Sequence, residues 1–338
     1  AIGSGVLPSS HPALIYQSNI NNKNKSVHFG IIAMGIKKSI AEALVIKTAT
    51  AILHDIGVGD IQVHINSMGD KDSSSKFVSE LNSYFRKNAD SVPAQIRQSM
   101  KKDIFKAYHQ LYIKHSCPDD DMPQSIKFLS DSNRKHLSEV LEYMETGDIS
   151  YEIDNFLVGN NECYSQTLFE IRRAQEKEKN DISVLAKGGR CDEVAKRMFN
   201  IDIPIVGAVL EFEKKGIRGS AYPVWPTGRR QAGKELNFIR KSKKPKIYFI
   251  QLGIEAKKRS LSLIDILRKA NVPIYHSLDN DKFAEQLSFA QYLEVPYAII
   301  MGHREALDGT VIVRDMNTQF QHTVLVDELP AYIKEIDL

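Results

Sequence analysis

The stretch "FLVGNNECYSQTLFEI", residues 156–171, decides how the fold of this chain is interpreted. It begins with an apolar run, continues through the polar segment Gly159-Asn160-Asn161-Glu162-Cys163 and ends in a second apolar run. Two apolar runs around a polar turn predict a β-hairpin that carries functional groups at its turn. The turn holds no arginine, lysine or histidine. The hairpin is therefore either a working site or the remains of one.

Length and composition indicate a soluble globular protein of two or three domains. The chain has 338 residues, of which 42% are hydrophobic and 26% charged. It holds no apolar run of about 20 residues and no secretory signal, which predicts no membrane attachment. Three widely spaced cysteines favour a reducing cytoplasm over a disulfide framework. Because the net charge is only +3, contacts with nucleic acid would have to come from local clusters of charge.

The first part of the chain is predicted to mix strands and helices. Residues 1–26 are rich in Ser, Asn and Pro and are predicted to be mostly loop. Residues 39–57 have apolar positions at helical spacing, with Ser39 as N-cap and Glu42 completing a capping box. Strands are predicted at 27–36 and 61–69.

Two later segments differ in character. Residues 70–147 are polar and predicted to be helical, and strands return beyond them. From residue 247 on, strands alternate with helices of 10 to 15 residues, which predicts an α/β domain. "IPIVGAVLEFEK" (203–214) reads as either a strand or the start of a helix.

A basic segment separates the two halves. Residues 228–246 carry eight Lys and Arg and one Glu. Its first part, "GRRQAGKE", matches most of a phosphate-binding loop, but Glu235 stands where that loop needs Ser or Thr for magnesium. We favour a basic linker, which either contacts an RNA backbone or is simply solvated; composition leaves both open.

Several segments, in chain order, resemble histidyl-tRNA synthetase, a class II aminoacyl-tRNA synthetase. "YEIDNFLVGNNECYSQTLFEI" (151–171) is similar to that family's second histidine signature, Leu-Val-Arg-Gly-Leu-Asp-Tyr-Tyr-Thr followed by Val-Phe-Glu-Ile. "AKGGRCDEVAKRMFNIDIPIVGAVLEFEK" (186–214) resembles its Gly-Gly-Arg-Tyr-Asp segment and motif 3, and residues from 251 on resemble its anticodon-binding domain.

The resemblance implies an α/β fold. It consists of a class II synthetase-type antiparallel sheet core with a helical insertion, followed by a C-terminal α/β anticodon-binding-type domain. The expected domains are a degenerate catalytic core (1–69 and 148–227), the insertion (70–147), a basic linker (228–246) and the anticodon-binding-like domain (247–338). Motif 1, a dimer-interface element in the family, has no counterpart in the sequence.

The chain departs from the family at the positions that carry the reaction. Gly159 stands where the family's signature arginine contacts histidine and the reacting groups. His28 and Ile32 stand at the positions of a Gln and a Glu that hold histidine, and Lys214 replaces the motif 3 arginine. Adenylate formation brings a carboxylate against a phosphate, and losing one preorganised donor costs on the order of 10² to 10³ in rate. The replacements therefore favour a catalytically inactive member.

We expect a binding or regulatory protein whose partner is tRNA or another structured RNA, with a protein partner or homodimer as a further possibility. Of two known kinds of inactive relative, the regulatory subunit of ATP phosphoribosyltransferase lacks the C-terminal domain. Retention of that domain here favours the second kind, an RNA-binding synthetase-like domain of a translation-control kinase. The alternative is a divergent active histidine–tRNA ligase, which alone would need ATP and magnesium. No cofactor and no metal are otherwise expected.

The expected site residues form two sets. The remnant histidine and ATP pocket comprises His28, Gly159, Glu162, Tyr164, Gly188, Gly189, Arg190 and Lys214. The candidate RNA contacts are Arg229, Arg230, Lys234, Arg240, Lys241, Lys243 and Lys244. No residue is assigned a catalytic role. The pocket beside Tyr164 is expected to be partly collapsed or lined by uncharged groups.

Overall fold

The computed structural model divides the chain into two compact units. The first contains residues 1–145 and 149–219, and the second residues 146–148 and 220–338. The structure describes residues 12–21, 26–114, 121–159, 164–174, 183–200, 202–213 and 245–336. Most of the predicted basic linker therefore lies outside the described residues.

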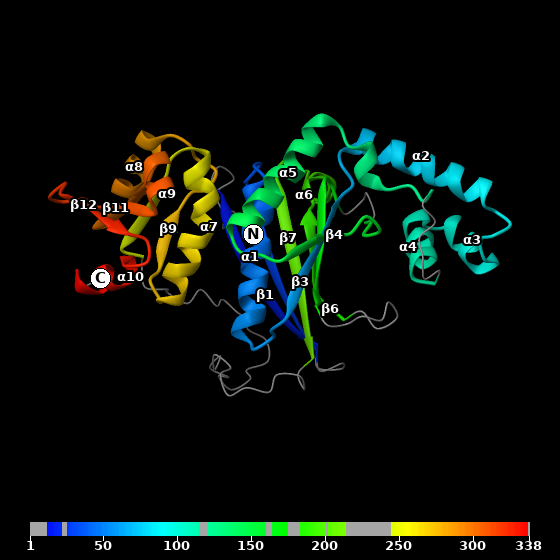
Figure 1. The fold of residues 1–338 in the computed structure, drawn as a ribbon, viewed down its shortest axis with the longest axis horizontal. Helices are drawn as coiled ribbons and strands as arrows, with labels where there is room; N and C mark the ends of the chain where they lie inside the picture. Colours follow the sequence, from blue (N-terminus) through cyan, green and yellow to red (C-terminus); the bar gives the residue numbers. More distant parts are fainter. Residues whose placement is uncertain are drawn as a thin grey trace. The chain divides into compact units, whose positions relative to one another are not determined.

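A seven-stranded sheet forms the centre of the first unit, in the order β1-β2-β7-β6-β5-β3-β4 (Figure 1). All neighbouring strands are antiparallel except β3 and β4, which are parallel. The ambiguous segment after residue 203 is a strand, β7. The strands are β1 (Ala13–Asn21), β2 (Ser26–Met34), β3 (Ile61–Ser67), β4 (Tyr151–Ile153), β5 (Thr167–Arg173), β6 (Val184–Arg190) and β7 (Ile205–Glu213).

Strand β1 corrects one expectation. Residues 1–26 are predicted mostly as loop, but Ala13–Asn21 pairs with β2 over nine consecutive residues. The segment is polar at its second half, "SNIN", which hides the strand signal. Backbone pairing with the strongly apolar β2 overrides that weak local preference.

Helices α1 (Ile40–Asp55) and α5 (Asp131–Thr146) are joined through buried and half-buried polar side chains. The predicted capping box of α1 is wrong: Ser39 makes no cap hydrogen bond and donates instead to Glu139 of α5, at 2.6 Å. Glu42, with no exposed surface, reaches away from the helix start. Tertiary partners have displaced the local capping arrangement. A short helix, α6 (Asp192–Phe199), follows β6.

The insertion is helical, as predicted. Residues 70–147 contain α2 (Lys71–Lys87), α3 (Ala94–Met100), α4 (Ile104–Lys114), a short 3-10 helix, η1 (Ser125–Phe128), and α5. Asp70 caps α2 by accepting from the backbone N–H of Ser73 at 2.9 Å. Phe77, Tyr108 and Leu168 share one buried apolar cluster, so the helices pack on the segment around β5.

The second unit is an α/β domain with a five-stranded sheet in the order β12-β11-β10-β8-β9. Helices α7, α9 and α10 share one apolar cluster with the sheet, and α8 packs in another. Its strands are β8 (Ile247–Gln251), β9 (Ile274–His276), β10 (Tyr297–Met301), β11 (Thr310–Asp315) and β12 (Gln321–Leu325). Its helices are α7 (Gly253–Lys269), α8 (Phe283–Tyr292), α9 (His303–Asp308) and α10 (Leu329–Glu335). In the described residues, no helix is both long and apolar enough to span a bilayer.

Candidate functional site

The strand register divides the seven-stranded sheet into two faces, because residues opposite each other on paired strands point to the same side. One face, called the site face below, holds one of the predicted pocket residues in β2, His28, and one in β6, Gly189. Its members across the sheet are His28, Gly30 and Ile32 in β2, Gly207 and Val209 in β7, Lys187 and Gly189 in β6, Leu168 and Glu170 in β5, and His64 and Asn66 in β3.

Arg190 lies on the opposite face and is 1% exposed. Its Nε and Nη2 each donate to a carboxylate oxygen of Glu42 at 2.7 Å. His136 of α5 lies 2.7 Å from the same carboxylate through its Nε2. Burial alone would raise the pKa of Glu42, but the hydrogen bonds of His136 and Arg190 outweigh it and hold the pKa below its usual value. Arg190 thus joins β6 to α1 and is turned away from the site face.

Three predicted pocket residues meet on the site face. A Cβ added at Gly159 would lie 2.6 Å from Cδ2 of Tyr164 and 3.2 Å from Cδ1 of Leu168. A Cβ added at Gly189 would lie 2.7 Å from Cδ1 of the same tyrosine and 2.5 Å from the carbonyl oxygen of Thr167. Both glycines are therefore needed for the ring to fit. The Tyr164 ring occupies the space that any side chain at residue 159 would enter.

The segment before the turn is fixed to the insertion. Asn66 of β3, which is fully buried, donates through Nδ2 to the carbonyl oxygen of Leu157 at 2.9 Å. The ring of Phe156 stacks on Tyr112 of α4 with a centroid distance of 4.1 Å and an interplanar angle of 9°. These contacts place the insertion helices over the β3–β5 end of the site face.

A network of ion pairs lies at that same end. Arg172 binds Asp154 through Nη1 at 2.9 Å and Glu170 through Nη2 at 2.8 Å. Lys187 lies 3.0 Å from the other carboxylate oxygen of Glu170. Burial raises the pKa of Glu170, but Arg172 and Lys187 more than offset this, so the pKa lies below its usual value. Both cations are already neutralised within the protein.

Two histidines face this network in their neutral forms. Burial and the charge of Arg172 hold the pKa of His64 below its usual value. His64 Nδ1 lies 3.9 Å from Oδ2 of Asp154. Burial also lowers the pKa of His109 in α4, where Arg172 acts in the same direction. Neither imidazole adds a positive charge to the site face near neutral pH.

The middle of the site face is open. Val209 of β7 is 52% exposed, and its neighbours across the strands are Gly30 and Lys187. His28 lies further along, 3.8 Å from Glu211. In the described part of the chain, no group of three His, Cys, Asp or Glu side chains is placed to hold a metal ion.

The placement of the predicted residues is therefore mixed. The site face holds His28 and Gly189, with Gly159 and Tyr164 packed over it. Gly188 lies on the opposite face, where a Cβ would meet Phe169 and the carbonyl oxygen of Gly207. Glu162, Lys214 and the seven candidate RNA contacts (Arg229, Arg230, Lys234, Arg240, Lys241, Lys243, Lys244) lie outside the described residues.

Sequence reasoning missed the ion-pair network. The alternation "FEIRR" at 169–173 was its one signal, because Glu170 and Arg172 are two residues apart on a strand and so share a face. Asp154 and Lys187 come from distant segments. No sequence spacing could have joined them to that pair.

Acidification is expected to destabilise the first unit through Glu42. Because its folded-state pKa lies below the usual 4.5, its carboxylate stabilises the fold above that pH, and the contribution is lost as the pH falls through the folded-state value. Thermal unfolding followed from about pH 6 to about pH 3 should show a steeper loss for the wild type than for Glu42→Gln. Equal losses in the two proteins would contradict the assignment.

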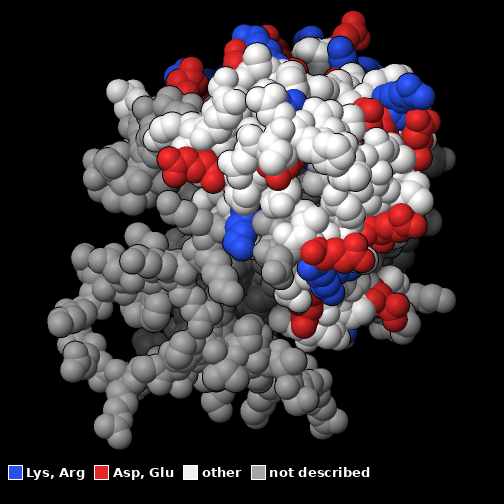
Figure 2. All heavy atoms as spheres, turned by 90° about the vertical axis from the view of Figure 1, so that its left-hand side faces the viewer, with Lys and Arg blue, Asp and Glu red and all other residues white. Residues whose placement is uncertain are grey.

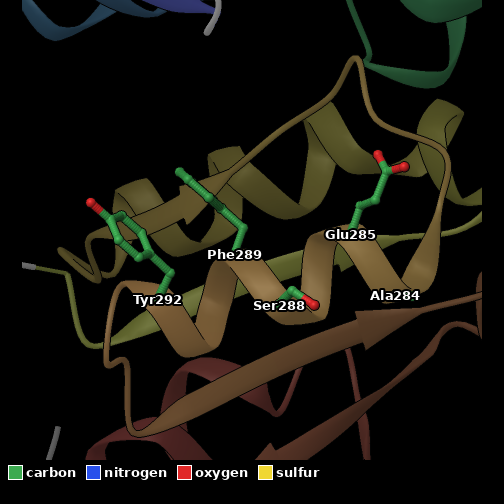
Figure 3. A pocket seen from close by; sticks show the side chains of 5 residues that line it. All are labelled: Ala284, Glu285, Ser288, Phe289 and Tyr292. Carbon is green, nitrogen blue, oxygen red and sulfur yellow. The ribbon is translucent and has the colours of Figure 1, made fainter.

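The second unit carries a shallow hollow of about 400 Å³ over α8. Figure 3 shows its five lining side chains, all from that helix: Ala284, Glu285, Ser288, Phe289 and Tyr292. Tyr292 is 78% exposed. Glu285 is paired with Lys282 at 2.6 Å, and the lining itself includes no Lys or Arg.

Comparison with known proteins agrees with this architecture. The family model described as "Anticodon binding domain" matches residues 246–336. The chain is 23% identical over 314 residues to histidine–tRNA ligase of Dehalococcoides mccartyi, covering 91% of this chain and 70% of that protein. It is 26% identical over 306 residues to histidine–tRNA ligase of Bacillus subtilis, covering 90% and 69%. The crystal structure of apo S. aureus histidyl-tRNA synthetase is similar with a TM-score of 0.48 and 19% identity, covering 98% of this chain and 79% of that chain.

The sequence matches extend across both units, and the sheet has the antiparallel order expected of a class II-like core. The second unit contains the segment that matches the anticodon-binding model. The chain is a divergent member of the histidyl-tRNA synthetase family, with a class II-like antiparallel core and a C-terminal α/β anticodon-binding domain.

Proposed function

We propose that this chain no longer forms histidyl-adenylate and acts as an RNA-binding or regulatory protein. The observation that carries the first half is the Tyr164 ring, which fills the space beside Gly159 where the family's signature arginine would project. An arginine supplies a planar, permanently charged fork that binds carboxylate and phosphate together. Gly159 offers no such group.

The other cations on the site face do not replace the signature arginine. The described strands place two cations on this face, Arg172 and Lys187, and both are paired with carboxylates. Ile32 provides no acceptor for a substrate ammonium group. Preorganised positive charge is the largest requirement of adenylate formation, because two anionic groups must meet in the transition state.

The second half of the proposal rests on the anticodon-binding domain and on the basic character of the chain outside it. A domain of this kind in the chain makes tRNA the first RNA to test. We keep the domain division predicted from the sequence, a cytoplasmic location and a protein partner as parts of this proposal. The two compact units support the domain division, and the small number of cysteines supports the location.

Total tRNA is expected to shift the full chain in a native gel at low salt. The shift should weaken steeply as salt is added, because phosphate contacts release counterions. Absence of any shift at low salt, where such contacts are strongest, would remove RNA binding from the proposal.

The alternative is a divergent active histidine–tRNA ligase that uses ATP and magnesium. The observation in its favour is the similarity to curated ligases over about nine-tenths of the chain. Histidine-dependent exchange between ATP and pyrophosphate separates the two functions, since only the ligase forms the adenylate.

A further inference from the structure

The outward side of helix α8 in the second unit carries little charge. Ala284, Ser288 and Tyr292 follow one another at intervals of four residues, so they lie along one side of the helix. All three are exposed, and Tyr292 is 78% exposed. Together with Glu285 and Phe289 they line the hollow of about 400 Å³ described above. These five residues are called the α8 face below.

The large exposed ring of the α8 face is supported from below. The Phe289 ring packs edge-on against the buried Tyr248 of β8, with centroids 6.0 Å apart and an interplanar angle of 72°. Tyr292 stacks on Phe289 at 6.0 Å and 24°, and Figure 3 shows the two rings side by side on the helix. Because Phe289 is held by the sheet and supports Tyr292, the exposed ring loses little side-chain entropy when another surface covers it.

The surroundings of the α8 face suit a protein better than a polyanion. Residues 246–336 contain ten Lys and Arg and twelve Asp and Glu. Some of these cations are paired within the unit, as Lys258 is with Glu255 and Arg304 with Asp308. On the face seen in Figure 2, blue side chains are scattered singly among white and red ones. An exposed, nearly uncharged face with an aromatic ring is typical of a protein contact, whereas phosphates require clustered cations.

The two ends of α8 carry opposite charges at equal distances from Ser288. Lys282 stands six residues before it and Glu294 six residues after it. When two copies of the helix lie antiparallel across a twofold axis at Ser288, each Lys282 faces Glu294 of the other copy. Lys282 also binds Glu285 of its own helix at 2.6 Å, but the two side chains remain 75% and 54% exposed. The ammonium group has three donors, so the contact within the helix leaves it able to bind a second carboxylate.

The same arrangement matches the shapes of the side chains. Ala284 stands four residues before Ser288 and Tyr292 four residues after it. Across the twofold axis, the tyrosine ring of each copy therefore lies over the small Ala284 of the other. A surface that complements itself in both charge and shape favours a second copy of this chain over an unrelated partner.

We propose that the α8 face joins two copies of this chain in an antiparallel, twofold-symmetric pair. This inference rests on the protein partner included in the proposed function, and it makes that partner a second copy. A helix of ten residues is about 15 Å long, so the contact is smaller than a standard protein interface. The pair is therefore weak and depends on protein concentration.

Sedimentation equilibrium of the full chain over a range of concentrations measures the dissociation constant of the pair. Ala284→Glu places a carboxylate beneath Tyr292 of the second copy. Its matched control is Ala331→Glu, the same change at an exposed position of α10. Lys282→Glu and Glu294→Lys each turn both end contacts of the pair into contacts between like charges. Circular dichroism checks that every variant is folded.

The wild type is expected to form dimers with a dissociation constant in the micromolar range or above. Ala284→Glu and each charge variant should raise that constant at least about tenfold, and the control should change it by less than about twofold. An equal mixture of Lys282→Glu and Glu294→Lys should form a heterodimer with an affinity close to that of the wild type, because both end contacts again join unlike charges. Mixing would not repair a folding defect.

A wild type that stays monomeric, a dimer unchanged by Ala284→Glu, or charge variants that mixing does not restore would overturn the inference. The tRNA gel shift of Ala284→Glu is measured beside it. A weaker shift without a change in dimerisation would assign the α8 face to RNA and also overturn the inference. A monomeric wild type that still shifts tRNA would leave the RNA-binding part of the proposed function intact.

Discussion

Replacement of Arg190 by methionine is expected to lower the free energy of unfolding of the first unit by about 3–5 kcal/mol, as removal of one partner from a buried ion pair does. The substitution leaves Glu42 charged, fully buried and without its two short hydrogen bonds from the guanidinium. His136 alone would then remain beside that carboxylate. Denaturant unfolding, followed by far-ultraviolet circular dichroism, measures the decrease in the free energy of unfolding.

A matched control is Arg97→Met, which removes an exposed arginine and should change stability by no more than about 0.5 kcal/mol. The double variant Glu42→Gln with Arg190→Met should lose less than the two single variants added together, because no unpaired charge stays buried. A loss for Arg190→Met as small as that of the control would contradict the structural role assigned to this arginine.

Gly159→Arg, which returns the family's signature residue, is expected to destabilise the first unit by about 1–3 kcal/mol, the usual cost of overpacking. Even its Cβ would come within 2.6 Å of the Tyr164 ring. The variant should also fail to gain adenylate formation, since the tyrosine occupies the space that the guanidinium must cross. Unfolding and ATP–pyrophosphate exchange are measured on the same preparation.

Gly59→Arg provides the matched control, because a Cβ at this exposed glycine meets nothing within 4 Å. It should leave stability close to that of the wild type. Adding Tyr164→Ala to Gly159→Arg should recover part of the loss, since removal of the ring opens the space. If the arginine is tolerated at residue 159 as well as at residue 59, the Tyr164 ring does not close the site as described.

Much of the fold could be predicted because local pattern and tertiary structure agree. The apolar period of the helices in the insertion and the alternation of strands and helices after residue 247 both reappear in the structure. Prediction failed where tertiary contacts override local signals. Strand β1 is polar in its second half and exists through pairing with β2, and Glu42 leaves its predicted cap for the distant Arg190.

The candidate site was predictable only in part. The apolar runs on each side of the turn resemble the family signature and identified Gly159 and Tyr164 as site residues. The sequence spacing did not predict that the tyrosine ring lies against both Gly159 and Gly189. Because residues alternate between the two faces along a strand, Gly189 faces the site and Arg190 faces the core. Assigning the two residues from the sequence would require knowing exactly where β6 ends.

Histidine-dependent exchange of labelled pyrophosphate into ATP is the most direct test of whether this site still makes an adenylate. The Bacillus subtilis ligase, to which the chain is 26% identical, serves as the positive control. A preparation of Tyr164→Ala exposes any contaminating host enzyme, whose activity would be the same in both samples. The proposed function predicts exchange at the level of the enzyme-free blank, with or without histidine. Histidine-dependent exchange well above that blank, changed by the tyrosine substitution, would show that the chain is an active ligase.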